Sequence, residues 1–189
     1  GFEICSFVLE GEIEHYDTLL DKWITLNQGD VQIIKAGKGI SHSEKLKKGS
    51  EIFQIWFDPN IQESLYIDAS YSDFRSTDFK IKIRNNIESK IVLSNENQLS
   101  LQSKGIEIYE HKFNNGKHSY KIKDKCYHSF FILNGILEIN NQQYTRGDFL
   151  IIDNENNLEL VTKNNTKVFE IVSLISPPYK TYAEIHKIS

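Results

Sequence analysis

The sequence contains no methionine, and only two of its 189 residues are cysteine. It also opens at Gly1-Phe2-Glu3, inside a strand-like pattern, so we expect a piece whose true N-terminus is missing. Cys5 and Cys126 lie far apart and form no Cys-x-x-Cys motif, so we expect two buried free thiols, with a secreted disulfide as the alternative. Free thiols favour a reducing compartment, and we therefore expect a cytoplasmic protein.

Long apolar runs and an excess of positive charge are missing as well. No run reaches the roughly 18 apolar residues of a membrane span, and no charged-then-apolar start marks a signal peptide. The formal net charge of -4 argues against a basic face for nucleic acid, so we expect no direct nucleic-acid binding and no membrane partner. The sequence also lacks the G-x-G-x-x-G, Walker, G-x-S-x-G and H-E-x-x-H motifs.

The residues that are abundant favour β structure. Apolar residues make up 39% of the chain, which is enough for a core, and they occur in short alternating runs bounded by Gly, Asn or Asp. The predicted strands are Glu3–Leu9, Gly11–Tyr16, Trp23–Leu26, Val31–Ala36, Glu51–Phe57, Lys80–Ile83, Lys90–Leu93, Leu99–Gln102, Ile106–Phe113, His118–Ile122, His128–Leu133, Ile136–Asn140, Phe149–Asp153, Leu158–Thr162 and Lys167–Leu174. Asp17–Lys22 and Asn60–Asp73 are predicted as loops. Many short strands at this spacing indicate a sandwich or a barrel.

An internal repeat organises the chain. Phe7–Glu14 resembles Phe131–Glu138, and each stretch reads as an apolar strand, a glycine turn and an alternating strand. A Gly-Asp pair follows each of them, at Gly29-Asp30 and at Gly147-Asp148. We therefore expect two β-modules, 1–60 and 100–175, joined by a connecting segment, 61–99, and followed by a tail, 176–189.

One segment carries metal-binding chemistry. The run from Gly29 to Glu44 passes through a strand and a glycine turn and ends in a polar strand with His42-Ser43-Glu44. Because residues i and i+2 of a strand point to the same face, His42 and Glu44 project together. An imidazole and a carboxylate side by side are two ligands for a transition metal. Taken alone, the pair reads more readily as an exposed strand that carries a histidine and a glutamate beside lysines.

The pattern around this pair resembles the pirin-like cupins. The segment Gly29–Glu44 resembles the second cupin motif of that family, and Gly1–His15 is similar to the stretch after its first motif. Gln54–Pro59 resembles the strand that follows. The second half, through Gly116, Gly135, Asn140-Asn141-Gln142 and Gly147-Asp148, is similar to the degenerate C-terminal cupin of bacterial pirin-like proteins.

This resemblance implies an all-β fold with two tandem double-stranded β-helices, a bicupin. It also implies one divalent metal in the N-terminal barrel, usually Fe, with Mn, Ni, Cu or Zn as alternatives. The family binds this metal through three histidines and one glutamate. His42 and Glu44 match two of the four ligands, and the other two are expected upstream of Gly1. Glu44 is also the expected catalytic group, because it could leave the metal and take a proton.

Other residues that could take part in catalysis or metal binding are expected to have structural roles. We expect Glu3 to be a polar strand-edge residue, and His15 and His111 to be exposed to solvent. Trp56 is expected to pack in the core, with a substrate pocket as its alternative. The second half lacks the spacing of metal-ligand histidines, so we expect no metal there and treat the remaining histidines as ordinary strand residues. These are His118 and His128.

Three functions remain open. The first is an oxygenase of the quercetin 2,3-dioxygenase type, acting on a small flavonol-like diphenolic. The second is a metal- or redox-sensing module that binds a protein partner without catalysis. The third is a metal-free structural bicupin.

Overall fold

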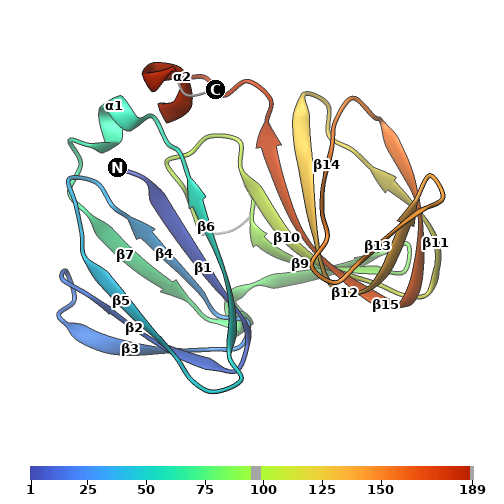
Figure 1. The fold of residues 1–189 in the computed structure, drawn as a ribbon, viewed down its shortest axis with the longest axis horizontal. Helices are drawn as coiled ribbons and strands as arrows, with labels where there is room; N and C mark the ends of the chain where they lie inside the picture. The colour runs from blue at the N-terminus through green and yellow to red at the C-terminus, as the bar shows by residue number, and fades with distance from the viewer. Residues whose placement is uncertain (95–98, 188–189) are drawn as a thin grey trace. The chain divides into compact units, whose positions relative to one another are not determined.

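The computed structural model describes residues 1–94 and 99–187, and the chain divides into two compact units. Unit 1 comprises Gly1–Asp78, Leu101–Lys104 and Pro178–Ser189, whereas unit 2 comprises Phe79–Ser100 and Gly105–Pro177. The chain therefore leaves unit 1, returns to it for a few residues and comes back to it again at the end (Figure 1).

Unit 1 contains two antiparallel sheets. The first has the order β6-β1-β4-β7 and the second the order β3-β2-β5. The strands are β1 (Glu3–Glu10), β2 (Glu12–Asp17), β3 (Lys22–Asn27), β4 (Val31–Lys35), β5 (His42–Leu46), β6 (Glu51–Phe57) and β7 (Ser70–Phe74). Short helices complete the unit: α1 (Ile61–Ser64), the 3-10 turn η1 (Ser76–Asp78) and α2 (Tyr182–His186).

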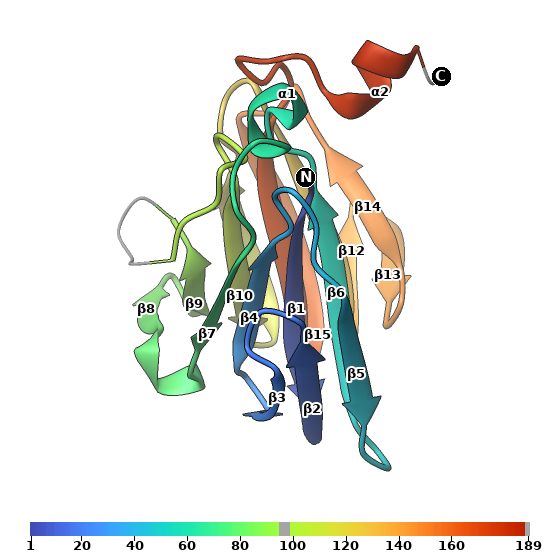
Figure 2. The same cartoon turned by 90° about the vertical axis from the view of Figure 1, so that its left-hand side faces the viewer.

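The inward-facing side chains of unit 1 form an apolar set and a polar set. Val8, Ile13 and Leu26 form an apolar cluster at one end, and Ile52 packs against it. Figure 2 shows β7, β4, β1 and β6 side by side as one sheet. Polar residues dominate a row across this sheet, where Gln54 and Gln32 lie opposite Ser6 on its two sides. Burying polar side chains costs free energy unless they are hydrogen-bonded, so this polar row marks a candidate site.

Unit 2 is one sheet of eight strands. Its order is β13-β12-β15-β10-β9-β8, with β11 paired to β15 and β14 paired to β12. The strands are β8 (Lys80–Arg84), β9 (Ile87–Leu93), β10 (Glu107–Phe113), β11 (Gly116–Lys121), β12 (Cys126–Ile139), β13 (Gln142–Thr145), β14 (Phe149–Ile152) and β15 (Asn157–Leu174). The core gathers aliphatic and phenylalanine side chains from most of them, among them Phe113, Phe130, Ile132, Leu137, Leu160 and Val168.

Asparagine pairs close two of the hairpins in unit 2. Asn85-Asn86 joins β8 to β9, and Asn140-Asn141 joins β12 to β13. All four asparagines have positive φ angles, between 50° and 62°. Two-residue hairpins of this twist require positive φ at both positions, and asparagine tolerates that region better than most residues.

The internal repeat is visible in the backbone hydrogen bonds. In unit 1 the Gly29 amide donates to the Val8 carbonyl, and the Val8 amide donates to the Asp30 carbonyl. In unit 2, Gly147, Ile132 and Asp148 make the same two bonds. Each Gly-Asp turn is also closed by its aspartate, whose carboxylate accepts from an amide three residues earlier, Asn27 or Thr145.

The all-β expectation is confirmed, but several predicted elements differ. Leu99–Gln102 forms no strand, and the predicted loop Asn60–Asp73 contains α1 and most of β7. One of the five predicted strands between His128 and Leu174 is β14, and the other four are parts of two long strands, β12 and β15. These strands run through Gly135 and Asn164-Asn165, whose positive φ angles bend the strand without ending it. None of the described helices is long and apolar enough to cross a membrane.

Candidate metal centre

Two neighbouring strands of unit 1 place four polar side chains on one face. His15 and Asp17 lie on β2, and His42 and Glu44 lie on β5. The register pairs His15 directly with Glu44 and Asp17 directly with His42. Side chains directly opposite one another in antiparallel strands are about 5 Å apart at Cβ, so the alternation alone assembles the group.

The geometry of this group suits a metal ion. One ligand atom each from His15, His42 and Glu44 can be chosen so that all lie within 4.8 Å of one another. His15 is fully buried, whereas His42 and Glu44 are half-buried. The Nδ1 atoms of both histidines are buried, and among the described residues neither has a hydrogen-bond partner. A buried imidazole nitrogen without a partner is costly, and a metal ion would satisfy it.

The orientation of His15 is fixed by Asp17. His15 Nε2 lies 3.0 Å from Asp17 Oδ2, and both side chains are fully buried. The other oxygen, Asp17 Oδ1, accepts from the backbone amides of Leu19 and Leu20 at 2.8 and 2.7 Å. Because the carboxylate accepts, Nε2 carries the proton and Nδ1 presents its lone pair to the site. A carboxylate holding the far nitrogen in this way is the usual arrangement around a metal-bound histidine.

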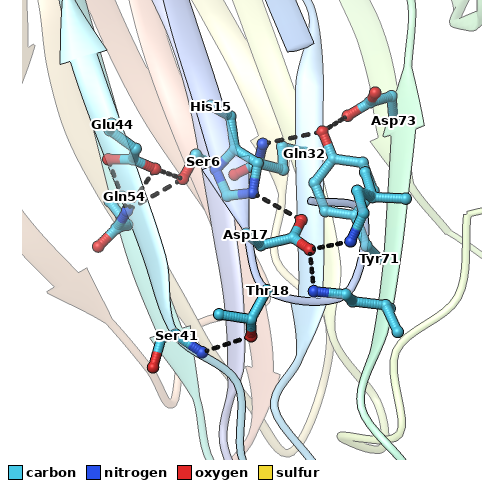
Figure 3. Close-up of polar contacts among 12 residues, drawn as sticks. Ser6, His15, Asp17, Thr18, Gln32, Ser41, Glu44, Gln54, Tyr71 and Asp73 are labelled. Atoms are coloured by element: carbon cyan, nitrogen blue, oxygen red, sulfur yellow. Dashed lines mark hydrogen bonds and ion pairs between the residues drawn. The ribbon is translucent and has the colours of Figure 1, made fainter. Parts of the chain in front are cut away.

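Glu44 is held by two polar residues of the facing sheet. Its Oε1 accepts from Ser6 Oγ and from Gln54 Nε2, both at 3.1 Å. Its Oε2 accepts only a longer bond, of 3.3 Å, from Gln54 Nε2 among the contacts of the described residues. Figure 3 shows Glu44, Ser6 and Gln54 together on one side of His15. Oε2 is therefore the less occupied oxygen of this carboxylate.

A tyrosine covers the other side of His15. The Tyr71 ring stacks on the imidazole, with centroids 5.0 Å apart and an interplanar angle of 16°. Its hydroxyl donates to Asp73 and accepts from Gln32 Nε2 at 3.1 Å (Figure 3). Burial, together with the bond to Asp73, raises the pKa of Tyr71 above its ordinary value, and burial likewise raises the pKa of Asp73. Tyr71 is therefore a neutral wall of the site.

Two expectations about unit 1 residues are wrong at this site and next to it. His15 is buried, not exposed, because the facing sheet and Tyr71 cover it. Glu3 lies on the central strand β1 and is also fully buried. Its carboxylate accepts from the amides of Gln102 and Ser103 at 2.6 and 2.8 Å, and from Ser103 Oγ at 2.6 Å. Three donors explain how the charge is tolerated there.

Two further expectations are also wrong. Trp56 is not a core residue: its side chain is 58% exposed, and its indole nitrogen donates to Gln54 Oε1. His111 is not solvated, because it is buried and bonded to Glu170. His118 and His128 lie on strands β11 and β12, and both are buried.

Sequence reasoning missed Asp17, Ser6, Gln54 and Tyr71 as parts of the site. A signal for Asp17 was present, because Ile13, His15 and Asp17 alternate along β2 in the same way as His42 and Glu44 alternate along β5. The other three lie on β1, β6 and β7, and no local pattern in the sequence shows that these strands face the histidines.

Comparisons with known proteins agree with this geometry. The Pirin family model matches residues 1–57, which include every residue of the metal-ligand group. Pirin-like protein 2 of Arabidopsis thaliana is 35% identical over 96 residues, which cover 49% of this chain and 28% of that protein. A quercetin 2,3-dioxygenase of Escherichia coli is 42% identical over 60 residues, which cover 30% of this chain and 26% of that protein.

The fold agrees over a longer stretch than the sequence does. A bacterial pirin from Escherichia coli, solved in complex with nickel(II), superposes with a TM-score of 0.73 and 24% identity over 92% of this chain and 72% of that one. The chain spans about a quarter of the length of the curated relatives it matches. Residues 1–57 therefore resemble a pirin domain, and the chain has an all-β cupin fold like that of the bacterial pirin.

Proposed function

We propose that unit 1 binds one divalent transition metal through His42 and Glu44, with His15 as a third donor. The observation that carries this proposal is the group itself, with three ligand atoms within 4.8 Å of one another. Two of its residues hold buried Nδ1 atoms that have no hydrogen-bond partner in the part of the chain that the structure describes. Two imidazoles and one carboxylate suit Fe, Mn, Ni, Cu or Zn. Iron is our first expectation, and the nickel(II) complex of the Escherichia coli pirin supports a transition metal in general.

We further propose an oxygenase reaction of the quercetin 2,3-dioxygenase type on a small flavonol-like diphenolic. The similarity of residues 1–57 to pirins, and of 60 residues to a quercetin 2,3-dioxygenase, supports this substrate class. When bound, the metal would supply Lewis acidity and redox chemistry for a reaction with dioxygen.

The residues of the chain would prepare the substrate. Glu44 would leave the metal and accept the proton of the substrate hydroxyl at Oε2, because Oε1 is already engaged by Ser6 and Gln54. Gln54 and Ser6 keep the carboxylate aimed while its charge changes. Tyr71 packs against His15 and excludes water from that side of the site.

The test has two stages. First, metal-free protein is titrated with Fe(II), Mn(II), Ni(II), Cu(II) and Zn(II), and bound metal is counted by elemental analysis. We expect close to one metal per chain, and at least about 10–100-fold weaker binding in His42→Ala and Glu44→Ala. His186→Ala is the matched control, because His186 is exposed on α2. Equal binding by all variants would overturn the assignment of the ligands.

Second, oxygen uptake is measured with the metal-loaded protein and a flavonol. We expect uptake that Glu44→Gln abolishes. One metal per chain without oxygen uptake would contradict the oxygenase and leave a metal-dependent binding protein. Absence of metal from the intact protein would contradict both parts of the proposal.

A further inference from the structure

Unit 2 contains a second buried polar cluster, centred on Glu170 of β15. Its carboxylate is fully buried and accepts from Tyr120 Oη at 2.6 Å, from His111 Nε2 at 2.8 Å and from His128 Nδ1 at 2.6 Å. Burial alone would raise the pKa of Glu170, but the hydrogen bonds from the two histidines lower it to about 2. The group is therefore a buried carboxylate ion, and each histidine nitrogen facing it carries a proton.

The two histidines differ in what their second nitrogen meets. His128 Nε2 accepts from the backbone amide of Lys123 at 2.8 Å, so this ring is held neutral between two fixed partners. His111 Nδ1 instead lies 2.8 Å from Ser89 Oγ. Since Nε2 of His111 holds the proton, Nδ1 is the acceptor, and the serine hydroxyl donates to it. Ser89, His111 and Glu170 thus form a continuous chain of hydrogen bonds.

The strand register brings this chain of bonds to a surface. Lys82 of β8, Ser89 of β9 and His111 of β10 are direct neighbours in one row across the sheet. All three line a cleft of about 800 Å³ within unit 2, and Tyr120 lines it as well. Glu170 is buried behind His111. The row itself presents the Ser89 hydroxyl, the His111 imidazole and the Lys82 ammonium on one wall of the cleft.

We propose that Ser89 is the nucleophile of an esterase-type site in unit 2, with His111 as its general base and Glu170 as the positioning residue. An adjacent base that is itself oriented by a carboxylate is the arrangement that activates a serine hydroxyl. The ammonium of Lys82, one strand away from Ser89, provides positive charge near the oxygen that becomes negative. This proposal is independent of the metal site, which lies in unit 1.

The reaction would follow in two balanced steps. Ser89 Oγ bonds to the acyl carbon of an ester while its proton passes to His111 Nδ1, and the alcohol leaves with that proton. Water then attacks the acyl carbon and gives a proton to Nδ1. The carboxylic acid departs, and the proton returns to Ser89 Oγ. Glu170 stays ionised throughout and stabilises the imidazolium that forms in each step.

The lining of the cleft indicates the class of ester. Among its described residues, the cations Lys82, Arg84, Lys121 and Lys123 outnumber the single carboxylate, Glu107. Lys123 and Glu107 form an ion pair with each other, at 2.5 Å. Ile87 and Ile91 provide an apolar floor. We therefore expect small esters that carry a negative charge and a short aliphatic body.

A serine-directed covalent probe tests the nucleophile. The full chain is treated with an alkyl fluorophosphonate, and the modified residue is located by peptide mass spectrometry. We expect one modification, at Ser89, which Ser89→Ala removes. Ser119→Ala is the matched control, because Ser119 is an exposed serine that lines the same cleft, and we expect it to leave labelling unchanged. Absence of modification at Ser89 would overturn the proposal.

Ester hydrolysis tests the substrate class and the roles. We expect turnover of 4-nitrophenyl hemisuccinate at least about 10-fold above that of 4-nitrophenyl acetate, since steering by opposite charge raises encounter rates by about 10-fold or more. Ser89→Ala should reduce the turnover of both esters to the background rate at which surface lysines react with them. Glu170→Gln should lower kcat while leaving KM unchanged, a split that a purely structural role would not produce. Hydrolysis that Ser89→Ala leaves intact would contradict the assignment.

Discussion

At the scale of single residues, the buried carboxylates act by deciding where protons sit. Asp17 in unit 1 and Glu170 in unit 2 each accept from an imidazole N–H, and in both cases this exposes the lone pair of the opposite nitrogen. In unit 1 that nitrogen, on His15, is offered to a metal. In unit 2 it is offered to a serine hydroxyl.

Asp17→Asn tests this control of the tautomer. The remaining oxygen can still accept from the amides of Leu19 and Leu20, so the amide nitrogen turns toward His15 Nε2. The proton of His15 then moves to Nδ1 and blocks the lone pair. We expect metal affinity to fall by about 10–100-fold, measured by titration of metal-free protein. Asp21→Asn is the control, since the Asp21 side chain accepts from the exposed Tyr16 hydroxyl and lies outside the ligand group, and equal losses in both variants would contradict the role of Asp17.

Glu170 also gives the protein a pH dependence of stability. Its pKa is 4.5 in the unfolded reference and about 2 in the folded state. Between these values the unfolded chain binds a proton that the folded chain does not, so the folded state loses stability as the pH falls from 4.5 toward 2. Urea denaturation should show a loss of up to about 3 kcal/mol across this window. Glu170→Gln should flatten that part of the curve, and Glu159→Gln, at an exposed position of the same strand, should not.

At the scale of elements, the two glycines of the repeat serve close packing as well as turning. A Cβ on Gly135 would lie 2.6 Å from Thr166 Oγ1 and 2.7 Å from Thr166 Cα, and one on Gly11 would lie 2.6 Å from Ser50 Oγ. Both positions have positive φ. In each unit, therefore, a glycine lets the backbone pass close to a hydroxyl-bearing residue that is distant in the sequence.

Gly135→Ala and Gly147→Ala separate the two roles of glycine. Both residues have positive φ, 83° and 91°, but nothing lies within 4 Å of a Cβ placed on Gly147. We expect Gly147→Ala to cost about 1 kcal/mol of unfolding free energy, and Gly135→Ala to cost about 1–3 kcal/mol more, because it also overpacks. Chemical denaturation measures both. Equal costs would show that the contact with Thr166 is relieved without strain.

The sequence was informative about elements and less so about their neighbours. Alternation and glycine punctuation predicted most strands, because both signals are local. His15 was misplaced because its burial depends on β7, which pairs with β4 in the other sheet and was predicted as a loop. Glu3 was misplaced for a similar reason, since its partners lie 99 and 100 residues further along the chain. His42 and Glu44 could be proposed as a pair from the sequence because both lie on one short strand, two residues apart.

At the scale of the whole molecule, the chain path brings two distant segments back to unit 1. Unit 1 takes back Leu101–Lys104 between two stretches of unit 2, and Glu3 is the residue that receives this segment. Pro178–Ser189 returns to unit 1 as well, where the Tyr179 hydroxyl donates to the Asp58 carbonyl at 3.0 Å. Domain boundaries predicted from composition cannot reveal such returns, because the returns depend on individual polar contacts between residues that are far apart in the sequence.

Glu3→Ala should therefore destabilise unit 1. The substitution leaves the buried amides of Gln102 and Ser103 without their acceptor, and we expect a loss of at least about 2 kcal/mol. Thermal and urea unfolding, combined with hydrogen exchange at β1, would locate the loss. Glu10→Ala, at an exposed position of the same strand, should stay close to the parent, and a similar cost in both variants would contradict the role of Glu3.

The returns of the chain to unit 1 set an order for synthesis on the ribosome. β1 is made well before its late partners, because the acceptor Glu3 meets Ser103 only after 100 more residues have been made. At translation rates of about 5–20 residues per second, this wait is on the order of 5–20 s. During that interval the Glu3 carboxylate lacks the three donors that it has in the folded chain. The strands β4 and β6 that flank β1 are complete by residue 57, so the hydrogen bonds of Glu3 are the last part of its surroundings to form.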